Sequence, residues 1–213
     1  MSINKSSEKR FCTLYLVRHG ETDWNVKGLL QGHTDIDLNK TGIKQAKELA
    51  KKLRRIKFAI SFSSDLLRAR RTAEIIATEK KIAVKTTTTL RERKFGRFEG
   101  AEWRQGEFRK LFDKFFRLST KERFNKRPYQ GYENNEELIA RLIPFIREIS
   151  VAYKGKNILI VSHGGIIMAF LTHLGFNDGK ELLPGSIENT AYIIIQCDGS
   201  DFFIKETSGI TAD

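Results

Sequence analysis

The chain has 213 residues, of which 40% are hydrophobic, and its formal net charge is +12 at pH 7. This length and composition suffice for one globular core. No apolar run is long enough to cross a membrane, and the polar, basic start of the chain lacks the hydrophobic stretch of a signal peptide. We therefore expect a cytoplasmic protein without stable membrane association, with a flexible tail at residues 1–10 and a single domain at residues 11–213.

The charge favours anionic partners, of which nucleic acids and phosphorylated metabolites are the two main classes. A solvated basic surface would explain the same excess of lysine and arginine equally well. Nucleic acid is the less favoured partner, because the sequence contains no zinc-finger spacing, RNP-like aromatic run or helix-turn-helix pattern. The two cysteines, Cys12 and Cys197, each adjoin a strand-like run and are interpreted as reduced, structural residues.

Strand-like and helix-like segments alternate along the chain. In chain order they are a strand at 11–17, a helix at 37–55, a strand at 58–63, a helix at 65–80, a strand at 85–90, helices at 102–118 and 134–150, a strand at 157–162, a helix at 166–174 and a hairpin at 190–207. Residues 119–134 are polar and are predicted to form a loop. This alternation predicts a three-layer α/β/α fold, with a mostly parallel central sheet and a closing antiparallel edge strand.

Several residues mark where the predicted helices begin. Thr41 is the expected N-cap of the first helix, and Asp65 lies near the start of the second, where a helix dipole favours an acidic residue. Asn134 or Asn135 is the expected cap of the helix at 134–150, and Pro144 predicts a kink within it.

Phenylalanines recur at helical spacing in the segment 102–118, with arginines and lysines between them. A basic helix of this kind lies on a membrane surface in some proteins. Packing on its own domain is the more common arrangement, and we expect a helical or loop-like cap at about residues 101–132. The basic residues of this segment are candidates for binding a second phosphate or for a solvated face: Arg104, Arg109, Lys110, Lys114, Arg117, Lys121, Arg123, Lys126 and Arg127.

Chemically active side chains follow four of the predicted strands. Arg18 and His19 follow the first strand, Arg68 comes shortly after the second, Glu92 follows the third, and His163 follows the fourth. In open α/β sheets, binding sites form beyond the carboxyl ends of the strands. We therefore expect these five residues to meet at one edge of the sheet.

This set of residues favours phosphoryl transfer. A metal is a poor candidate, since two fixed arginine charges oppose a cation and the close histidine pairs of zinc motifs are missing. Arginines bind phosphate with two parallel hydrogen bonds, and their charge keeps a neighbouring histidine neutral and nucleophilic. A carboxyl group opposite could protonate the leaving oxygen. The hypothesis is a covalent phosphohistidine formed without metal or cofactor.

Five blocks of the sequence resemble the signatures of the histidine phosphatase superfamily, also called the phosphoglycerate-mutase-like family. They are LVRHGETDWN, QGHTDIDLNKTG, SSDLLRARRTAE, LRERKFGRFEG and VSHGG, in family order from about Leu14 to His163. One RHG triplet would be a weak signal, but five ordered blocks are a specific one.

The resemblance implies a role for each matching residue. His19 would be the phosphorylated nucleophile, Arg18 and Arg68 would grip the phosphoryl oxygens with His163, and Glu92 would be the proton donor and later the base. Asn25 and the Gly164 backbone would add phosphate contacts, and Gln31 and Gly32 would line the substrate pocket. Arg68 on a solvated basic helix face and Glu92 in a surface ion pair are the structural alternatives. His33 and His173 are assigned no catalytic role.

The resemblance favours the phosphatase branch over the mutases. Mutases of the family typically read SHGN followed by serine and arginine, whereas this chain reads SHGGIIMAF, which is apolar. We expect a phosphomonoesterase that acts on a small phosphorylated metabolite. The alternatives are a phosphoglycerate mutase, a fructose-bisphosphate phosphatase and an α-ribazole phosphatase. The sequence determines neither the substrate nor the oligomeric state.

Overall fold

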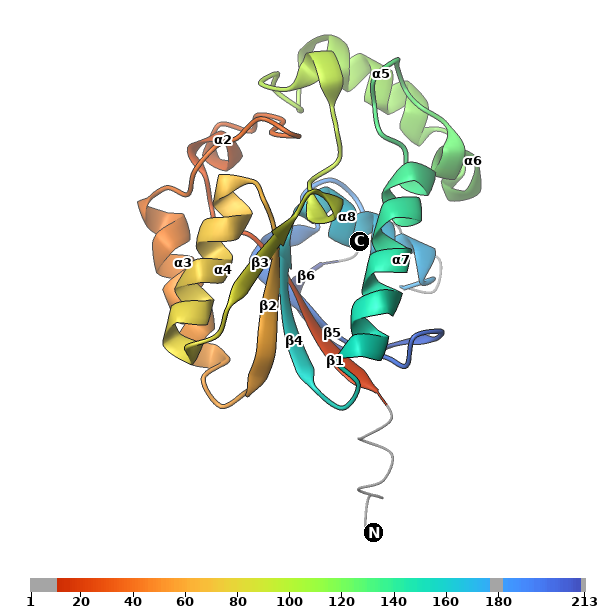
Figure 1. Ribbon diagram of the computed structural model, residues 1–213. Coiled ribbons are helices and arrows are strands. Elements are labelled where there is room, and N and C mark those ends of the chain that lie inside the picture. The colour runs from red at the N-terminus through yellow and green to blue at the C-terminus, as the bar shows by residue number, and fades with distance from the viewer. Residues whose placement is uncertain (1–10, 177–181, 212–213) are drawn as a thin grey trace.

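The computed structural model describes residues 11–176 and 182–211, so the predicted tail at 1–10 lies outside the described residues. Six strands form one sheet in the order β3-β2-β4-β1-β5-β6 (Figure 1). They are β1 (Cys12–Arg18), β2 (Phe58–Ser64), β3 (Val84–Thr87), β4 (Asn157–Ser162), β5 (Ile187–Cys197) and β6 (Phe202–Ile210). The first four are parallel, and the antiparallel hairpin β5–β6 joins the sheet along β1. The predicted α/β fold is confirmed.

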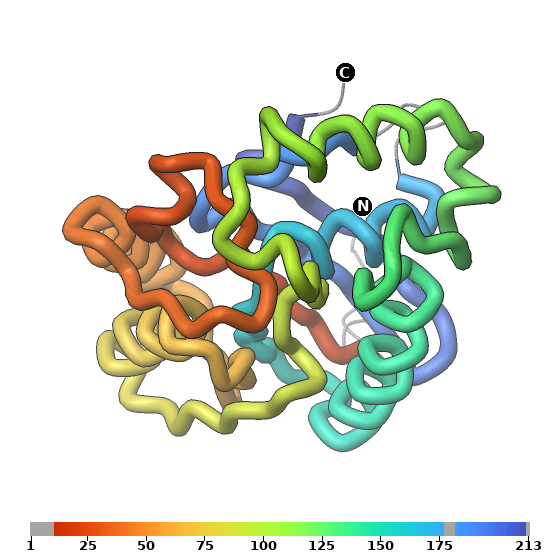
Figure 2. Tube along the Cα trace, turned by 90° about the horizontal axis from the view of Figure 1, so that it is seen from above, coloured from red at the N-terminus to blue at the C-terminus, as the bar shows by residue number. Residues whose placement is uncertain are grey.

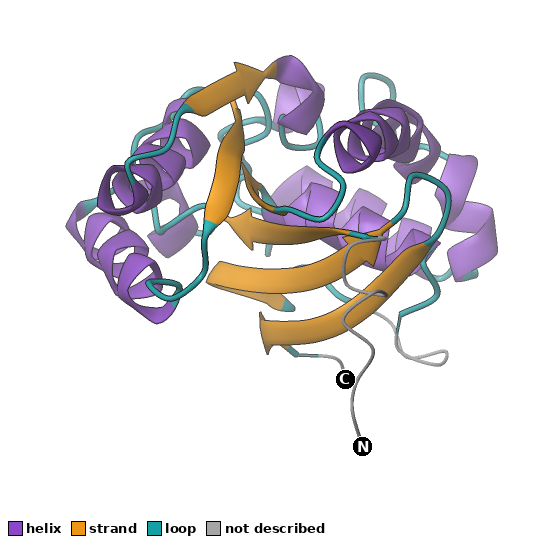
Figure 3. Ribbon diagram, turned by 60° about the horizontal axis from the view of Figure 1, so that its bottom comes forward, coloured by secondary structure: helices purple, strands orange, loops and turns teal. Residues whose placement is uncertain are grey.

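Helices cover both faces of the sheet (Figure 3). They are α2 (Asp23–Val26), α3 (Lys40–Lys52), α4 (Leu67–Lys80), α5 (Gly106–Phe116), α6 (Thr120–Asn125), α7 (Asn135–Ala152) and α8 (Gly164–His173), with short 3₁₀ turns η1 (Thr88–Leu90) and η2 (Gly96–Phe98). Alternate residues of β1 supply both layers, because successive side chains of a strand point to opposite faces. Leu16 packs in the core with α7 and α8, whereas Val17 packs in the core with α3 and α4.

Several predicted element boundaries are wrong. Asn39, not Thr41, caps α3, because its side chain accepts a hydrogen bond from the Gly42 backbone N–H at 2.8 Å. α4 begins at Leu67, two residues after Asp65, and has no acidic residue in its first turn. The strand predicted at 85–90 ends at Thr87, since the next three residues form η1.

The predicted loop at 119–134 contains the helix α6, which the sequence reading missed. Its signal is a capping box, in which the Ser119 side chain accepts from the Glu122 backbone and the Glu122 side chain accepts from the Ser119 backbone. The predicted cap at Asn134 is confirmed, and α7 continues through Pro144.

Two glycines allow the chain after β1 to lie directly against the start of α3. A Cβ atom on Gly20 would lie 2.5 Å from the carbonyl oxygen of Gly42, and a Cβ on Gly42 would lie 2.1 Å from the carbonyl oxygen of Glu21. Both obstacles are backbone atoms, which cannot rotate away as a side chain can. The position of His19 therefore depends on this close backbone contact.

We expect Gly42→Ala to lower the free energy of unfolding by about 1–3 kcal/mol, because the added methyl group forces the two backbones apart. Lys47→Ala, on the exposed side of the same helix, should change it by less than about 0.5 kcal/mol. Urea denaturation monitored by circular dichroism measures both. Equal stability of the two variants would contradict the assigned contact.

Candidate active site

The structure brings together at the carboxyl end of the sheet all nine residues that the sequence singles out. Eight of them line one cavity of about 1000 Å³: Arg18, His19, Asn25, Gln31, Gly32, Arg68, Glu92 and Gly164. His163 is fully buried and is not among the lining residues, and its ring centroid is 5.1 Å from that of His19. The five charged or titratable members reach this point from four different strand ends, as the parallel topology predicts.

His19 and His163 form a buried pair of neutral imidazoles. Burial lowers the pKa of each histidine well below 6.5, and the charge of Arg68 lowers both further. The Nδ1 atom of His19 lies 2.7 Å from the carbonyl oxygen of Gly20. A carbonyl oxygen only accepts, so Nδ1 carries the proton and the lone pair of the neutral ring is at Nε2.

Arg68 is completely buried, which excludes the alternative of a solvated helix face. Its two terminal nitrogens donate to the carbonyl oxygens of Gly32 at 2.8 Å and Thr34 at 2.9 Å. Burial lowers the pKa of Arg68 to about 10, so the group stays protonated at neutral pH. Arg18 donates through Nη1 to the carbonyl oxygen of Ile187.

Several buried nitrogens of this group have no hydrogen-bond partner within the described residues. They are Nε of Arg18, Nε of Arg68 and both ring nitrogens of His163. Buried polar groups in proteins are nearly always hydrogen-bonded, so a cluster of unpaired ones marks a site for a ligand. Because both guanidinium nitrogens are donors on cations, the site suits an anion with several acceptor oxygens.

Glu92 is held by backbone N–H groups, not by the surface ion pair considered from the sequence. Its Oε1 accepts from the Arg93 N–H at 2.7 Å, and its Oε2 accepts from the Gly165 N–H at 3.0 Å, in the first turn of α8. A Cβ on Gly165 would lie 2.4 Å from Glu92 Oε1. The second glycine of the SHGG block therefore leaves room for the carboxyl group, a role that the sequence reading did not assign.

Asn189 on β5 is a site residue that sequence reasoning missed. Its side-chain amide lies 3.1 Å from the carbonyl oxygen of His19 and 3.4 Å from Oδ1 of Asn25. Asn25 itself closes a capping box with Thr22 at the start of α2. Among the residues without an assigned role, His33 contacts the carbonyl oxygen of Glu92 through Nε2 at 2.9 Å, and His173 is exposed.

The segment expected to form the cap builds the far side of the cavity. Phe108 and Phe112 of α5 are buried in an aromatic cluster with Phe98 and Tyr132. Buried Phe115 contacts the rings of Phe112 and Tyr132, so the stripe packs on its own chain. α5 and α7 lie on either side of α8 in the view from above (Figure 2). No helix in residues 11–176 and 182–211 is long and apolar enough to cross a membrane.

The basic residues of this segment fall into two groups. Three of the nine candidates line the cavity: Arg104, Arg109 and Arg123. Arg109 also forms an ion pair with Asp113 at 2.8 Å on the same helix. The other six are exposed, and two of them, Lys126 and Arg127, pair with glutamates on the surface.

Comparisons with known proteins identify the family of this chain. The profile of the histidine phosphatase superfamily (branch 1) matches residues 14–208, and the chain therefore belongs to that superfamily. It is 37% identical over 166 residues to the uncharacterized phosphatase PhoE of Bacillus subtilis (strain 168), covering 76% of this chain and 77% of that protein. The family predicted from the sequence is confirmed.

Other relatives carry more specific names. A metal-independent phosphoserine phosphatase of Arabidopsis thaliana is 34% identical over 185 residues, covering 84% of this chain and 76% of that protein. The crystal structure of phosphoglycerate mutase from Bacillus anthracis str. Sterne superimposes with a TM-score of 0.78 at 26% identity, covering 97% of this chain and 96% of that one. Phosphatases and mutases thus share this fold.

The two buried histidines should make stability depend on pH. Both pKa values lie well below 6.5 in the folded protein, so between pH 7.5 and 5.5 the unfolded chain takes up protons that the folded protein does not, and the free energy of unfolding falls. We expect a loss of about 1 kcal/mol per histidine. His163→Gln should lose about half of this pH dependence, whereas exposed His173→Gln should retain it.

Urea denaturation at the two pH values, in buffers free of phosphate, measures the effect. A wild-type pH dependence in His163→Gln would contradict the assignment of a neutral buried imidazole.

Proposed function

We propose that this protein is a metal-independent phosphomonoesterase that hydrolyses small phosphorylated metabolites through a phosphohistidine on His19. The observation that carries the proposal is the cluster of unpaired buried nitrogens beside a neutral imidazole, on Arg18, Arg68 and His163. A tetrahedral phosphoryl group supplies the acceptor oxygens that these nitrogens lack. The names of the relatives agree with a phosphatase.

In the first step, Nε2 of His19 attacks the phosphorus atom and the bond between phosphorus and the ester oxygen breaks. The hydrogen bond of Nδ1 to the Gly20 carbonyl aims Nε2 and stabilises the positive charge that develops on the ring. Arg18 and Arg68 bind the phosphoryl oxygens as charge shifts onto them. Glu92 donates its proton to the ester oxygen, which leaves as an alcohol.

In the second step, the Glu92 carboxylate takes a proton from water, and the oxygen of that water attacks the phosphorus atom. The bond between phosphorus and His19 breaks, which releases inorganic phosphate and restores the neutral imidazole. The same two N–H groups, of Arg93 and Gly165, hold the carboxyl group in both steps. One residue can therefore act as acid and then as base without moving far.

The cavity indicates the size and character of the substrate. It has room for a small organic group beside the phosphate, and the cap contributes mainly aromatic side chains, including Trp103, Phe112 and Tyr132. Phosphoserine is one candidate, since a relative is named for it. Fructose bisphosphates and α-ribazole phosphate remain candidates from the sequence blocks.

We expect His19→Ala to abolish hydrolysis of p-nitrophenyl phosphate, with a loss of at least about 10⁴-fold in kcat, because no other group can form the intermediate. Exposed His173→Ala is the matched control and should keep wild-type activity. Brief incubation of the native enzyme with a ³²P-labelled substrate should label the protein with an acid-labile, alkali-stable phosphate. Undiminished turnover by His19→Ala would overturn the proposal.

A mutase would give a different product pattern. Buried Ile166 and Ile167 follow the SHGG block, which gives this part of α8 no charged group for a phosphoglycerate carboxylate. With 3-phosphoglycerate as substrate, we expect phosphate release to exceed formation of 2-phosphoglycerate in a coupled assay. The reverse ratio would assign the protein to the mutases.

Gly165→Ala should lower kcat by about 10- to 100-fold, because its methyl group occupies the place of Glu92 Oε1. Alanine favours the helical conformation over glycine, so the thermal midpoint should stay the same or rise. Steady-state kinetics and thermal denaturation measure the two quantities. A fall in kcat that only accompanies a fall in the thermal midpoint would contradict the steric explanation.

A further inference from the structure

Glu92 lies on a stretch of chain without regular secondary structure, between η1 and η2. The backbone carbonyls of such a stretch have no strand or helix partner, and a buried carbonyl without a partner costs free energy. The proposed reaction needs the Glu92 carboxyl group within hydrogen-bonding reach of the leaving oxygen in both steps. Other parts of the chain must therefore fix this backbone.

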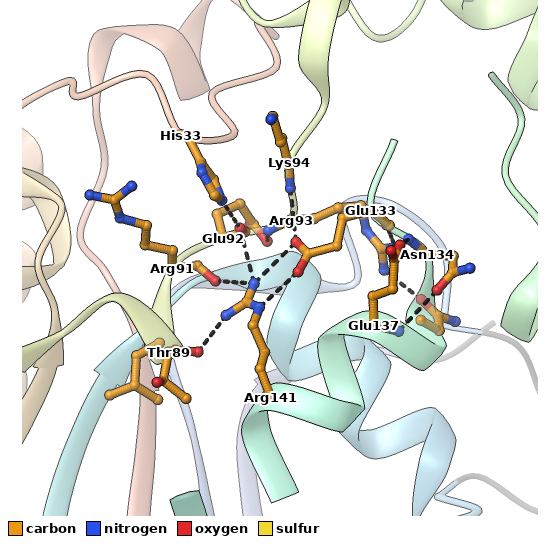
Figure 4. Close-up of polar contacts among 12 residues, drawn as sticks. His33, Thr89, Arg91, Glu92, Arg93, Lys94, Glu133, Asn134, Glu137 and Arg141 are labelled. Atoms are coloured by element: carbon orange, nitrogen blue, oxygen red, sulfur yellow. Dashed lines mark hydrogen bonds and ion pairs between the residues drawn. The ribbon is translucent and has the colours of Figure 1, made fainter. Parts of the chain in front are cut away.

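Arg141 supplies much of this fixation from the second turn of α7 (Figure 4). Its Nη2 donates to the carbonyl oxygen of Arg91 at 2.7 Å and to that of Glu92 at 3.2 Å, and its Nη1 donates to the carbonyl oxygen of Thr89. One guanidinium group thus binds three carbonyls of the segment that ends at Glu92. His33, in the loop between α2 and α3, also contacts the Glu92 carbonyl.

Glu133 binds Arg141 and also contacts the backbone of Lys94, two residues after Glu92. Its Oε1 accepts from Arg141 Nε at 2.7 Å and its Oε2 accepts from Nη2 at 3.1 Å. The same carboxylate accepts from the Lys94 N–H at 3.1 Å, and the Glu133 N–H donates to the Lys94 carbonyl at 3.0 Å. The two side chains are only 22% and 16% exposed, so the pair is better shielded from water than a surface ion pair.

We propose that Arg141 is a positioning residue that sets the position of the Glu92 carboxyl group by binding the backbone on which it stands. The proposal rests on the proposed function, in which Glu92 is the proton donor. Among the described residues, the cavity lining includes Glu92 but neither Arg141 nor Glu133. Arg141 therefore acts on the reaction through Glu92 and not by contact with substrate.

The shape of the guanidinium group is essential to this role. The three guanidinium nitrogens lie in one rigid plane and together donate to both carboxylate oxygens of Glu133 and to three backbone carbonyl oxygens. A lysine at the same position carries a single ammonium group and cannot reach both sets. Arg141→Lys should therefore preserve the charge and lose most of the positioning.

The test compares two substrates that differ in their need for a proton donor. The leaving group of p-nitrophenyl phosphate departs readily as an anion, whereas that of an alkyl phosphate needs protonation. Because kcat/KM reports the steps up to departure of the leaving group, a misplaced Glu92 affects the alkyl ester more. We expect Arg141→Met and Arg141→Lys to lower kcat/KM for the alkyl phosphate by about 10- to 100-fold and for p-nitrophenyl phosphate by less than about 3-fold.

Two further variants make the comparison specific. Arg147→Met removes another arginine of α7, which donates to the Ser200 carbonyl and does not line the cavity, and should leave both values unchanged. Glu92→Gln should show the same substrate dependence as Arg141→Met, only larger. Adding Arg141→Met to Glu92→Gln should cause no further loss for the alkyl phosphate.

Equal losses for both substrates, or no loss, in Arg141→Met and Arg141→Lys would overturn the positioning role and leave the proposed function intact. If Arg141→Met does not fold, Arg141→Lys alone decides. A Glu92→Gln variant without any substrate dependence would overturn the assignment of Glu92 itself, and with it the role of Arg141.

Discussion

The carboxyl end of this sheet depends on one constraint, the complete burial of the Arg68 guanidinium group. A buried charge is costly unless its N–H groups are hydrogen-bonded, and the carbonyls of Gly32 and Thr34 satisfy two of them. These carbonyls neutralise no charge, and within the described residues Arg68 forms no ion pair. Burial lowers the pKa values of His19 and His163, and the positive potential of Arg68 lowers them further and attracts an anion. The Arg68 charge therefore contributes both to the neutral state of the nucleophile and to the phosphate site.

The same positive potential constrains the carboxyl group. A glutamate free to move next to Arg18 and Arg68 would pair with an arginine and block the phosphate site. In this structure the Glu92 carboxylate instead accepts from the N–H groups of Arg93 and Gly165, and its backbone is bound to α7. The nucleophile is thus fixed by β1 and the proton donor by the helical layer on one face of the sheet, while the cap shapes the remaining cavity.

Much of the fold follows from local patterns. Apolar strands separated by amphipathic helices predict the parallel sheet, since only helices can cover both faces of such a sheet. Most errors concern the ends of elements, and one concerns a whole short helix. Asn39 and Thr41 are both good capping residues, so the local sequence does not choose between them. In the structure α3 starts after Asn39, beside the contact of Gly42 with the chain after β1. The short helix α6 was missed because its polar composition outweighed the capping box at Ser119.

Local sequence patterns predict most of the side chains that meet at the site. Parallel strands place their carboxyl ends at one edge, so residues that follow separate strands converge there, as His19, Arg68 and His163 do. The contacts that hold them in place follow from packing between segments that are distant in the chain. Asn189 and Arg141 lie far along the chain from the backbone carbonyls that they contact, and an irregular segment carries no periodic signal for its partners. Such contacts depend on how whole elements pack together, and no local sequence pattern predicts that packing.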